Sequence, residues 1–145
     1  MSRGLVAEAH TEVAAPPDAV WQALVDPRMV KQYMMGAEVV SDWKRGSAIV
    51  WKGEYEGKTF EDKGKILAIE PGQRLSYTHF SPLTGDPDVP ENYHTVTVEL
   101  APGGKRGSTG VTLTQDNNDD AESRDHSAAF WQDMLDRLKG IVERY

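Results

Sequence analysis

Hydrophobic and polar residues alternate along the first part of the chain. In the segment Leu5–Val13, apolar or small residues hold the odd positions and polar residues hold most of the even ones. Such alternation predicts a strand with one buried face. Pro16 and Pro17 end the strand and favour a helix start, because a proline in the first helical turn loses no hydrogen bond. We expect a short helix that stops at Asp26–Pro27 and a second over about Arg28–Met35, which ends at a glycine.

Six strand-like runs follow these helices. Most are separated by short turns such as Glu56–Gly57 and Pro71–Gly72, and strands joined in this way pair antiparallel. The connection Ser81–Asn92 is longer, and because loops of this length often serve a function, we interpret it as a candidate lip or lid. The predicted strands are Glu38–Asp42, Ala48–Tyr55, Thr59–Glu70, Arg74–Phe80, Tyr93–Leu100 and Ser108–Asp116.

The last predicted element is a long amphipathic helix over about Ala121–Tyr145. Asp119 or Asp120 would cap it, with Glu122 at the capping-box position. A strand, two short helices, six strands and one long helix together predict an α+β fold: an antiparallel sheet of about seven strands, with one face covered by the C-terminal helix. The apolar face of that helix consists of Phe130, Trp131, Met134, Leu135, Leu138, Ile141, Val142 and Tyr145.

Composition and charge restrict the class of protein. A chain of 145 residues is typical of one domain, so we expect a single domain over residues 1–145. The 16 Lys and Arg against 23 Asp and Glu give a net charge of -7, which disfavours nucleic-acid binding because that needs clustered positive charge. Without cysteine or a long apolar run, the chain offers no disulfide, thiolate zinc site or membrane span. Its start lacks a signal-peptide core, and we predict a cytoplasmic protein.

Local motifs for a metal, a nucleotide or an activated nucleophile are missing from the sequence. Asp116–Asp120 is similar to the start of a calcium loop, but Ala121 replaces the required glycine and Ser127 the bidentate glutamate. Gly103–Ser108 lacks the spacing of a phosphate loop, and no GxSxG elbow is present. We therefore predict neither a metal site nor a cofactor. The histidines, which show no metal-motif spacing, are His10, His79, His94 and His126.

Three segments resemble one known family. Ala15–Pro27 is similar to the "APPxxVWxALTDP" opening of the activator of heat-shock protein 90 ATPase homologue-like family, within the SRPBCC (START/Bet v 1-like) superfamily. Gly64–Pro71 with Arg74–Thr78 is similar to its "GxVxEIxPxxRLxYT" segment, and Trp131–Leu138 to its "GWxxxLxxL" helix. The resemblance spans nearly the whole chain in family order. It implies a helix-grip fold, in which a curved antiparallel sheet wraps around the C-terminal helix and leaves a cavity for a hydrophobic ligand.

Two positions depart from the family pattern. Tyr33–Met34 stands where the family usually shows an aromatic pair with tryptophan, and Phe130 replaces the glycine that commonly precedes the helix tryptophan. A phenylalanine there would narrow the cavity.

Period-2 spacing predicts which strand residues face this cavity. Leu75, Tyr77 and His79 share one strand face, and Ile49, Trp51 and Tyr55 share another. A few polar tips among apolar walls would orient a small molecule, although packing in the core is the alternative for each aromatic residue. The predicted ligand-binding residues are Trp51, Tyr55, Tyr77, His79, Trp131 and Met134.

Three functions remain open at this point. The first, which we favour, is a protein that binds a small hydrophobic or aromatic molecule between sheet and C-terminal helix. The second is an enzyme of the polyketide cyclase or dehydratase type, with Tyr77 and His79 as candidate catalytic acid and base. The third is an interaction protein that stimulates the 90-kDa heat-shock chaperone, as the family name suggests, although the eukaryotic activators carry an additional N-terminal domain.

Overall fold

A single antiparallel sheet organises the computed structural model, which describes residues 4–34, 36–82 and 85–144. Within these ranges seven strands follow the order β1-β7-β6-β5-β4-β3-β2. The strands are β1 Leu5–Val13, β2 Glu38–Ser41, β3 Ala48–Tyr55, β4 Lys58–Glu70, β5 Arg74–His79, β6 His94–Pro102 and β7 Thr109–Asn118. The helices are α1 Pro17–Val25, α2 Pro27–Tyr33 and α3 Ala121–Val142, with a 3-10 turn η3 at Pro90–Asn92.

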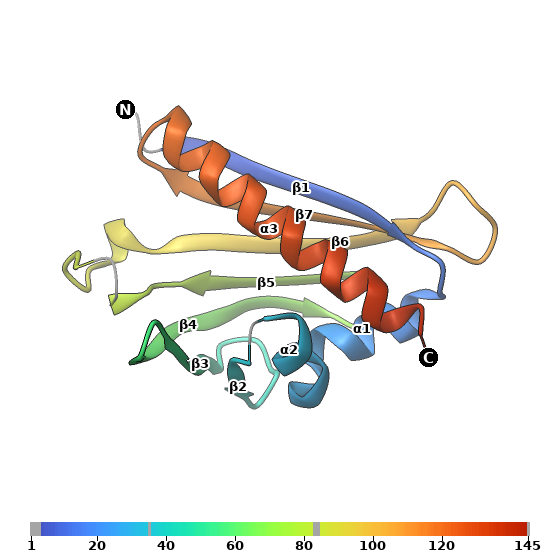
Figure 1. Cartoon of the computed structure of the whole chain (residues 1–145), viewed down its shortest axis with the longest axis horizontal. Helices are drawn as coiled ribbons and strands as arrows, with labels where there is room; N and C mark the ends of the chain where they lie inside the picture. Colours follow the sequence, from blue (N-terminus) through green and yellow to red (C-terminus); the bar gives the residue numbers. More distant parts are fainter. Residues whose placement is uncertain (1–3, 35, 83–84, 145) are drawn as a thin grey trace.

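The path of the chain explains this strand order. β1 lies at one edge of the sheet, and the chain then crosses through α1 and α2 to β2 at the opposite edge. From there each strand pairs with the next until β7 lies beside β1 (Figure 1). In the predicted β3–β4 turn, Glu56 and Gly57 have φ of 50° and 79°, as a two-residue hairpin loop requires. The predicted antiparallel meander is confirmed.

Asp26 ends α1 and begins α2. Its carboxylate accepts the backbone N–H of Arg28 at 2.9 Å, and Pro27 occupies the first position of α2, where a missing N–H is harmless. The side-chain and backbone hydrogen bonds from Arg28 hold the pKa of Asp26 below its usual range. The second helix therefore begins one residue earlier than predicted, and it ends at Tyr33 with Met34 as its C-cap, short of the predicted end at Met35.

α3 lies diagonally across one face of the curved sheet (Figure 1). It packs against β1 and β7 and contacts α1 and α2. It ends at Val142, earlier than predicted, and the next two residues form a turn. The buried face of α3 is Trp131, Met134, Leu135, Leu138, Ile141 and Val142. The predicted apolar stripe is confirmed for these six residues, whereas Phe130 is exposed and Tyr145 lies outside the described residues.

Asp120 caps α3. Its carboxylate accepts the backbone N–H of Ser123 at 2.8 Å, and this hydrogen bond lowers the pKa of Asp120. Ser123 is thus the third helical residue, and Glu122 is the second. The capping box that the sequence suggested with Glu122 is therefore wrong, because the glutamate stands one position too early to reach back to the cap.

The long connection after β5 is held by its own polar contacts. The carboxylate of Asp88 forms an ion pair with Lys63 of β4 and accepts the hydroxyl hydrogen of Tyr93 at 2.6 Å. The amide of Asn92 donates to the carbonyl oxygen of Pro87 at 2.8 Å. These contacts fix residues 87–93 beside the outward-facing side chains of β4.

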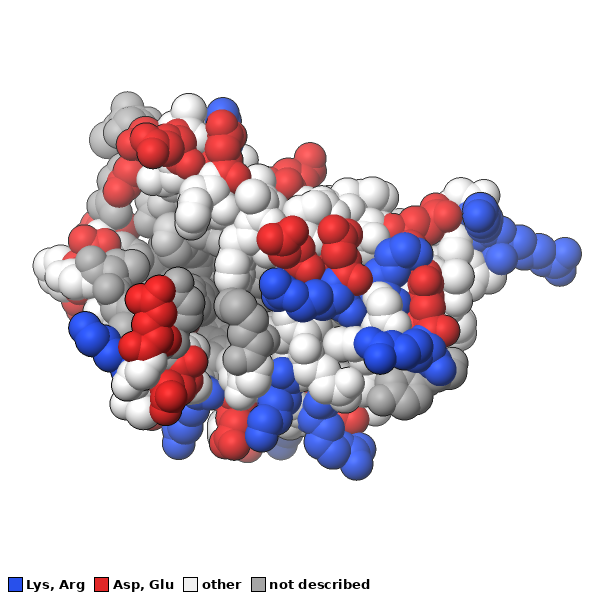
Figure 2. Space-filling view, viewed as in Figure 1, with Lys and Arg blue, Asp and Glu red and all other residues white. Residues whose placement is uncertain are grey.

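The surface carries charges of both signs. On the face seen in Figure 2, acidic and basic side chains are interspersed on the side of the molecule that carries α3. Across the described ranges, none of the helices combines the length and the apolar character that a membrane crossing needs.

β4 and β5 approach so closely at Gly64 that no side chain fits there. A Cβ at this position would overlap the carbonyl oxygen of Thr78. Close by, the backbone N–H of Lys65 donates to the hydroxyl of Thr78 at 2.9 Å, and the pairing register shifts between Ile66 and Ala68. Gly64 therefore sets how the two strands pass each other.

We expect Gly64→Ala to lower the free energy of unfolding by about 3 kcal/mol, because the added methyl group forces the two backbones apart. Gly140→Ala is the matched control. It lies in α3 with nothing within 4 Å of its added Cβ, and should raise stability by up to ~1 kcal/mol through helix propensity. Urea denaturation of the three proteins measures both effects. Equal stability of Gly64→Ala and the parent would contradict the close approach.

Candidate functional site

Two adjoining chambers lie between the sheet and the helices α2 and α3. The smaller, which we call the inner chamber, has a volume of about 30 Å³. The larger, which we call the outer chamber, has a volume of about 120 Å³. Four residues form walls of both: Tyr33, Met34, Trp51 and Met134.

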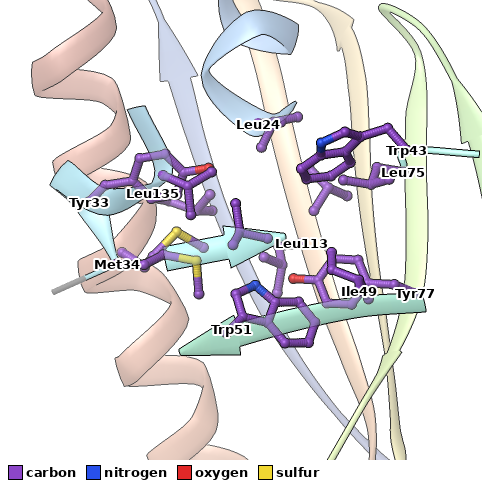
Figure 3. Close-up of a pocket in the computed structure, with 14 residues that line it drawn as sticks. Leu24, Tyr33, Met34, Trp43, Ile49, Trp51, Leu75, Tyr77, Leu113 and Leu135 are labelled. Carbon is purple, nitrogen blue, oxygen red and sulfur yellow. The ribbon is translucent and has the colours of Figure 1, made fainter. Parts of the chain in front are cut away.

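The inner chamber is too small for an organic ring. Its volume is about one water molecule's share of the liquid, ~30 Å³, and its walls are almost entirely apolar. Figure 3 shows Trp51, Ile49 and Tyr77 on the sheet facing Tyr33 and Met34 across this space. The remaining lining residues are Leu24, Val30, Val39, Trp43, Leu75, Val98, Leu113, Met134 and Leu135.

The outer chamber is large enough for a group of about one ring. An apolar cavity of ~150 Å³ accepts benzene in a well-studied protein interior. The outer chamber reaches the surface beside Phe130, which is 40% exposed, and Arg137, which is exposed on α3. The complete lining is Tyr33, Met34, Ala37, Trp51, Phe60, Asp62, His79, Phe130, Trp131, Met134 and Arg137.

Trp51 is the centre of an aromatic cluster on the inner face of the sheet. Its ring lies 5.1 Å from that of Tyr77, tilted by 49°, and 5.1 Å from that of His79, nearly edge-on at 63°. Both contacts reach across β4, which lies between β3 and β5. Gly64 lies between Asp62 and Ile66 on this strand and has no side chain.

His79 forms a hydrogen-bonded pair with Asp62. The distance from His79 Nε2 to Asp62 Oδ2 is 2.9 Å, and because a carboxylate only accepts, the imidazole N–H is the donor. Both side chains are largely buried, with 25% of His79 and 15% of Asp62 exposed. The second carboxylate oxygen, Asp62 Oδ1, is fully buried and has no hydrogen-bond partner among the described residues.

The structure separates the predicted site residues into two groups. Trp51, His79, Trp131 and Met134 line the outer chamber. Tyr77 lines only the inner one, and the side chain of Tyr55 lies outside the described part of the chain. Tyr77 and His79 therefore share a strand face, as predicted, but do not face one chamber.

Burial also changes the chemistry of Tyr77. It raises the pKa of the Tyr77 hydroxyl well above its ordinary value, and desolvation raises that of Tyr33 in the same way. A phenol with a raised pKa is a poorer acid near neutral pH. Of the two candidate catalytic residues, His79 is thus the better placed for proton transfer.

Two neighbouring aromatic residues of α3 play different parts. The indole N–H of Trp131 donates to the side-chain oxygen of Gln115 on β7, which holds a buried ring as a wall of the outer chamber. Phe130 contacts Trp131 edge-on with ring centres 5.2 Å apart and is partly exposed at the edge of the chamber. Phe130 therefore does not fill the interior.

Sequence reasoning missed several wall residues. Asp62 and Phe60 lie on the inward-facing positions of β4, and alternation along the predicted strand Thr59–Glu70 was the signal that could have identified them. Tyr33, Met34 and Ala37 lie where α2 ends, and no periodic pattern marks such a place. Conversely, the described residues of the segment Ser81–Asn92, the predicted lid, contribute to neither chamber.

The polar run at the end of β7 has a structural role. The amide of Asn117 donates to the carbonyl oxygens of Glu91 and Tyr93, at 2.7 and 3.0 Å. The side-chain amide of Asn118 donates to the carbonyl oxygen of Leu5 at 3.0 Å. Together with the Asp120 cap, these contacts join three segments.

In the part of the chain that the structure describes, no three His, Cys, Asp or Glu side chains are arranged to hold a metal ion.

A curved seven-stranded antiparallel sheet, a long helix across its face and two short helices after the first strand define a helix-grip protein. The sequence profile of the activator of Hsp90 ATPase homolog 1-like proteins matches residues 14–143. The chain belongs to this family.

Several solved structures share this fold. ChR145 from Cytophaga hutchinsonii is 50% identical with a TM-score of 0.85, covering 99% of this chain and 97% of that one. DynU16, from the dynemicin biosynthetic locus, is 22% identical with a TM-score of 0.77, covering 95% of this chain and 47% of that one. The Aha1 dimer from Colwellia psychrerythraea is 19% identical with a TM-score of 0.73, covering 96% of each chain. The last two show the fold alone, and a search of curated proteins found no match.

The Asp62–His79 pair should reduce stability relative to an apolar replacement. We expect His79→Leu, which leaves the carboxylate without its donor, to lower the free energy of unfolding by about 1–3 kcal/mol. The double variant Asp62→Leu/His79→Leu should be at least as stable as the parent. Chemical denaturation of both variants measures this. A double variant clearly less stable than the parent would show that the pair is a net stabilising contact.

Proposed function

We propose that the protein binds a small apolar or aromatic molecule in the outer chamber. The observation that carries this proposal is a space of about 120 Å³ beside α3, walled mainly by aromatic side chains and containing one polar pair. Apolar walls with a few polar groups are the usual composition of small-molecule sites. The ligand-binding residues in this proposal are Trp51, His79, Trp131 and Met134, together with Asp62 and Phe60.

The wall between the two chambers allows for a larger ligand. Two of its four residues are Met34 and Met134, and methionine side chains rearrange more readily than branched or aromatic ones. Movement of these side chains would join the inner chamber to the outer one. Family membership supports the same function, because the related superfamily folds often hold hydrophobic ligands, and DynU16 belongs to a biosynthetic locus for a small molecule.

A second candidate function, acid–base catalysis, is favoured by the 2.9 Å hydrogen bond between His79 and Asp62. A carboxylate that accepts from one imidazole nitrogen makes the other the proton acceptor. An enzyme of the cyclase or dehydratase type would use this second imidazole nitrogen to remove a proton next to a carbonyl group.

Hydrogen exchange tests this second function. In D₂O, the native protein should speed hydrogen exchange at the methyl group of acetophenone, and His79→Leu should not. Equal exchange rates with the native protein and with His79→Leu would exclude His79 as the base.

The third candidate, stimulation of the 90-kDa heat-shock chaperone, rests on the family name alone.

A larger side chain in the wall of the outer chamber should weaken ligand binding there. Ala37 is buried in its wall, so we expect Ala37→Leu to weaken binding of one-ring aromatic compounds at least ten-fold. In the parent, a ligand at 100 times its dissociation constant should add about 2.7 kcal/mol to stability and change the fluorescence of Trp51 and Trp131. Thermal unfolding and fluorescence titration measure these effects.

The control for this experiment is Ala101→Leu. Ala101 is exposed on β6 and lines neither chamber, so the same enlargement there should leave binding unchanged. Binding that survives Ala37→Leu, or a parent that binds none of the compounds, would contradict the proposed site.

A further inference from the structure

The hydrogen-bonding groups around the outer chamber are unequally satisfied. The hydroxyl of Tyr33 donates to the carbonyl oxygen of Ala23 at 2.8 Å, and the indole N–H of Trp131 donates to Gln115. Asp62 Oδ1, in contrast, is buried with no partner, and it is the one side-chain atom of this kind in the described ranges. The unsatisfied hydrogen-bonding atom of this wall is therefore an acceptor. Its own accessible surface is almost nil, so a ligand donor in the chamber reaches it only when the side chains around it move apart.

Two neighbouring side chains hold the carboxylate of Asp62 in place. His79 donates to the other carboxylate oxygen at 2.9 Å, and the imidazole itself is fixed against the ring of Trp51. Asp62 lies opposite Trp51 in the pairing of β3 with β4. The carboxylate therefore cannot turn to find another donor without breaking its contact with His79.

A buried acceptor in an apolar wall discriminates between ligands that carry a hydrogen-bond donor and ligands that do not. A ligand O–H or N–H supplies the missing hydrogen bond, and bonds to charged groups are among the stronger ones. A purely apolar ligand of the same shape covers the oxygen and leaves it unpaired, which is the arrangement that sites built for hydrogen bonding reject most strongly. A ligand carboxylate brings a second negative charge towards the first.

We propose that the outer chamber selects a ligand of about one ring that carries a hydrogen-bond donor, and that Asp62 Oδ1 accepts this donor. This inference rests on the proposed binding function and names the chemical class of its ligand. Asp62 is the specificity-determining residue, and His79 is its positioning residue. Arg137 lies at the exposed edge of the chamber, so an anionic ligand held by its guanidinium is the competing arrangement.

Four one-ring compounds test the proposal by calorimetric titration of the full chain. Phenol and toluene have nearly the same shape and differ in the donor, benzylamine carries a cationic donor, and benzoate carries an anionic acceptor. We expect phenol, benzylamine or both to bind at least ten-fold more tightly than toluene, and benzoate to bind more weakly than either donor. The two donors distinguish a neutral O–H from an ammonium group as the preferred chemistry.

Variants assign the preference to Asp62. Asp62→Leu should abolish the difference between phenol and toluene while toluene binds at least as well as before. Glu61→Leu is the control, because Glu61 is the exposed neighbour on the opposite face of β4, and it should keep the preference. If Asp62→Leu does not fold, nuclear Overhauser contacts of bound phenol with Trp51 and Met134 in the native protein, with its hydroxyl end nearest Asp62, provide the same test.

The outcomes separate this inference from the function on which it rests. Toluene that binds as tightly as phenol overturns the donor preference and leaves the binding function in place. A preference for benzoate assigns recognition to Arg137 and overturns the role of Asp62, as does a phenol preference that persists in Asp62→Leu. Failure of all four compounds to bind overturns both the inference and the proposed function.

Discussion

One helix has to cover a sheet that is wider than itself. Seven strands spaced by about 4.8 Å span about 29 Å, whereas an α-helix with its side chains is ~10–12 Å wide. α3 therefore packs against β1 and β7 at one side of the sheet, and α2 packs against β2 at the other. The strands between them are covered by side chains that reach across the gap, and both chambers lie in this gap.

The side chains in the gap are large because they must span it. Trp51 and Tyr77 extend from the sheet, and Tyr33 extends from α2 (Figure 3). Met134 of α3 lines the same space. Large, rigid side chains fill such a space incompletely, and the volumes of the two chambers are the remainder. The placement of Asp62 in this remainder is the feature that packing does not explain, because an unpaired buried carboxylate oxygen opposes folding. The proposed ligand donor would explain why a polar group is kept there at a cost to stability.

The strands, the antiparallel pairing of those joined by short turns and the buried helix face could be predicted from periodicity and turn chemistry, because alternation and 3.6-residue spacing report burial directly. The pairing of β1 with β7 could not be predicted in this way. The polar pair could not. Its formation depends on the position of β4 relative to β5, and there Gly64 and the shifted register at Ile66 decide which residues meet. Periodicity correctly placed Tyr77 and His79 on one face, but it carries no information about the ring of Trp51, which contacts both side chains and lines both chambers.

Ligand binding in the outer chamber requires a real apolar space between helix and sheet, bounded by Trp51 and Met134. Xenon occupies dry apolar cavities without requiring specific chemistry, so diffraction from a crystal of this protein under xenon pressure detects such a space. We expect a xenon atom in the outer chamber, in contact with Trp51, Trp131 and Met134. An interior without xenon, with the methionine side chains closed over the space, would contradict the account.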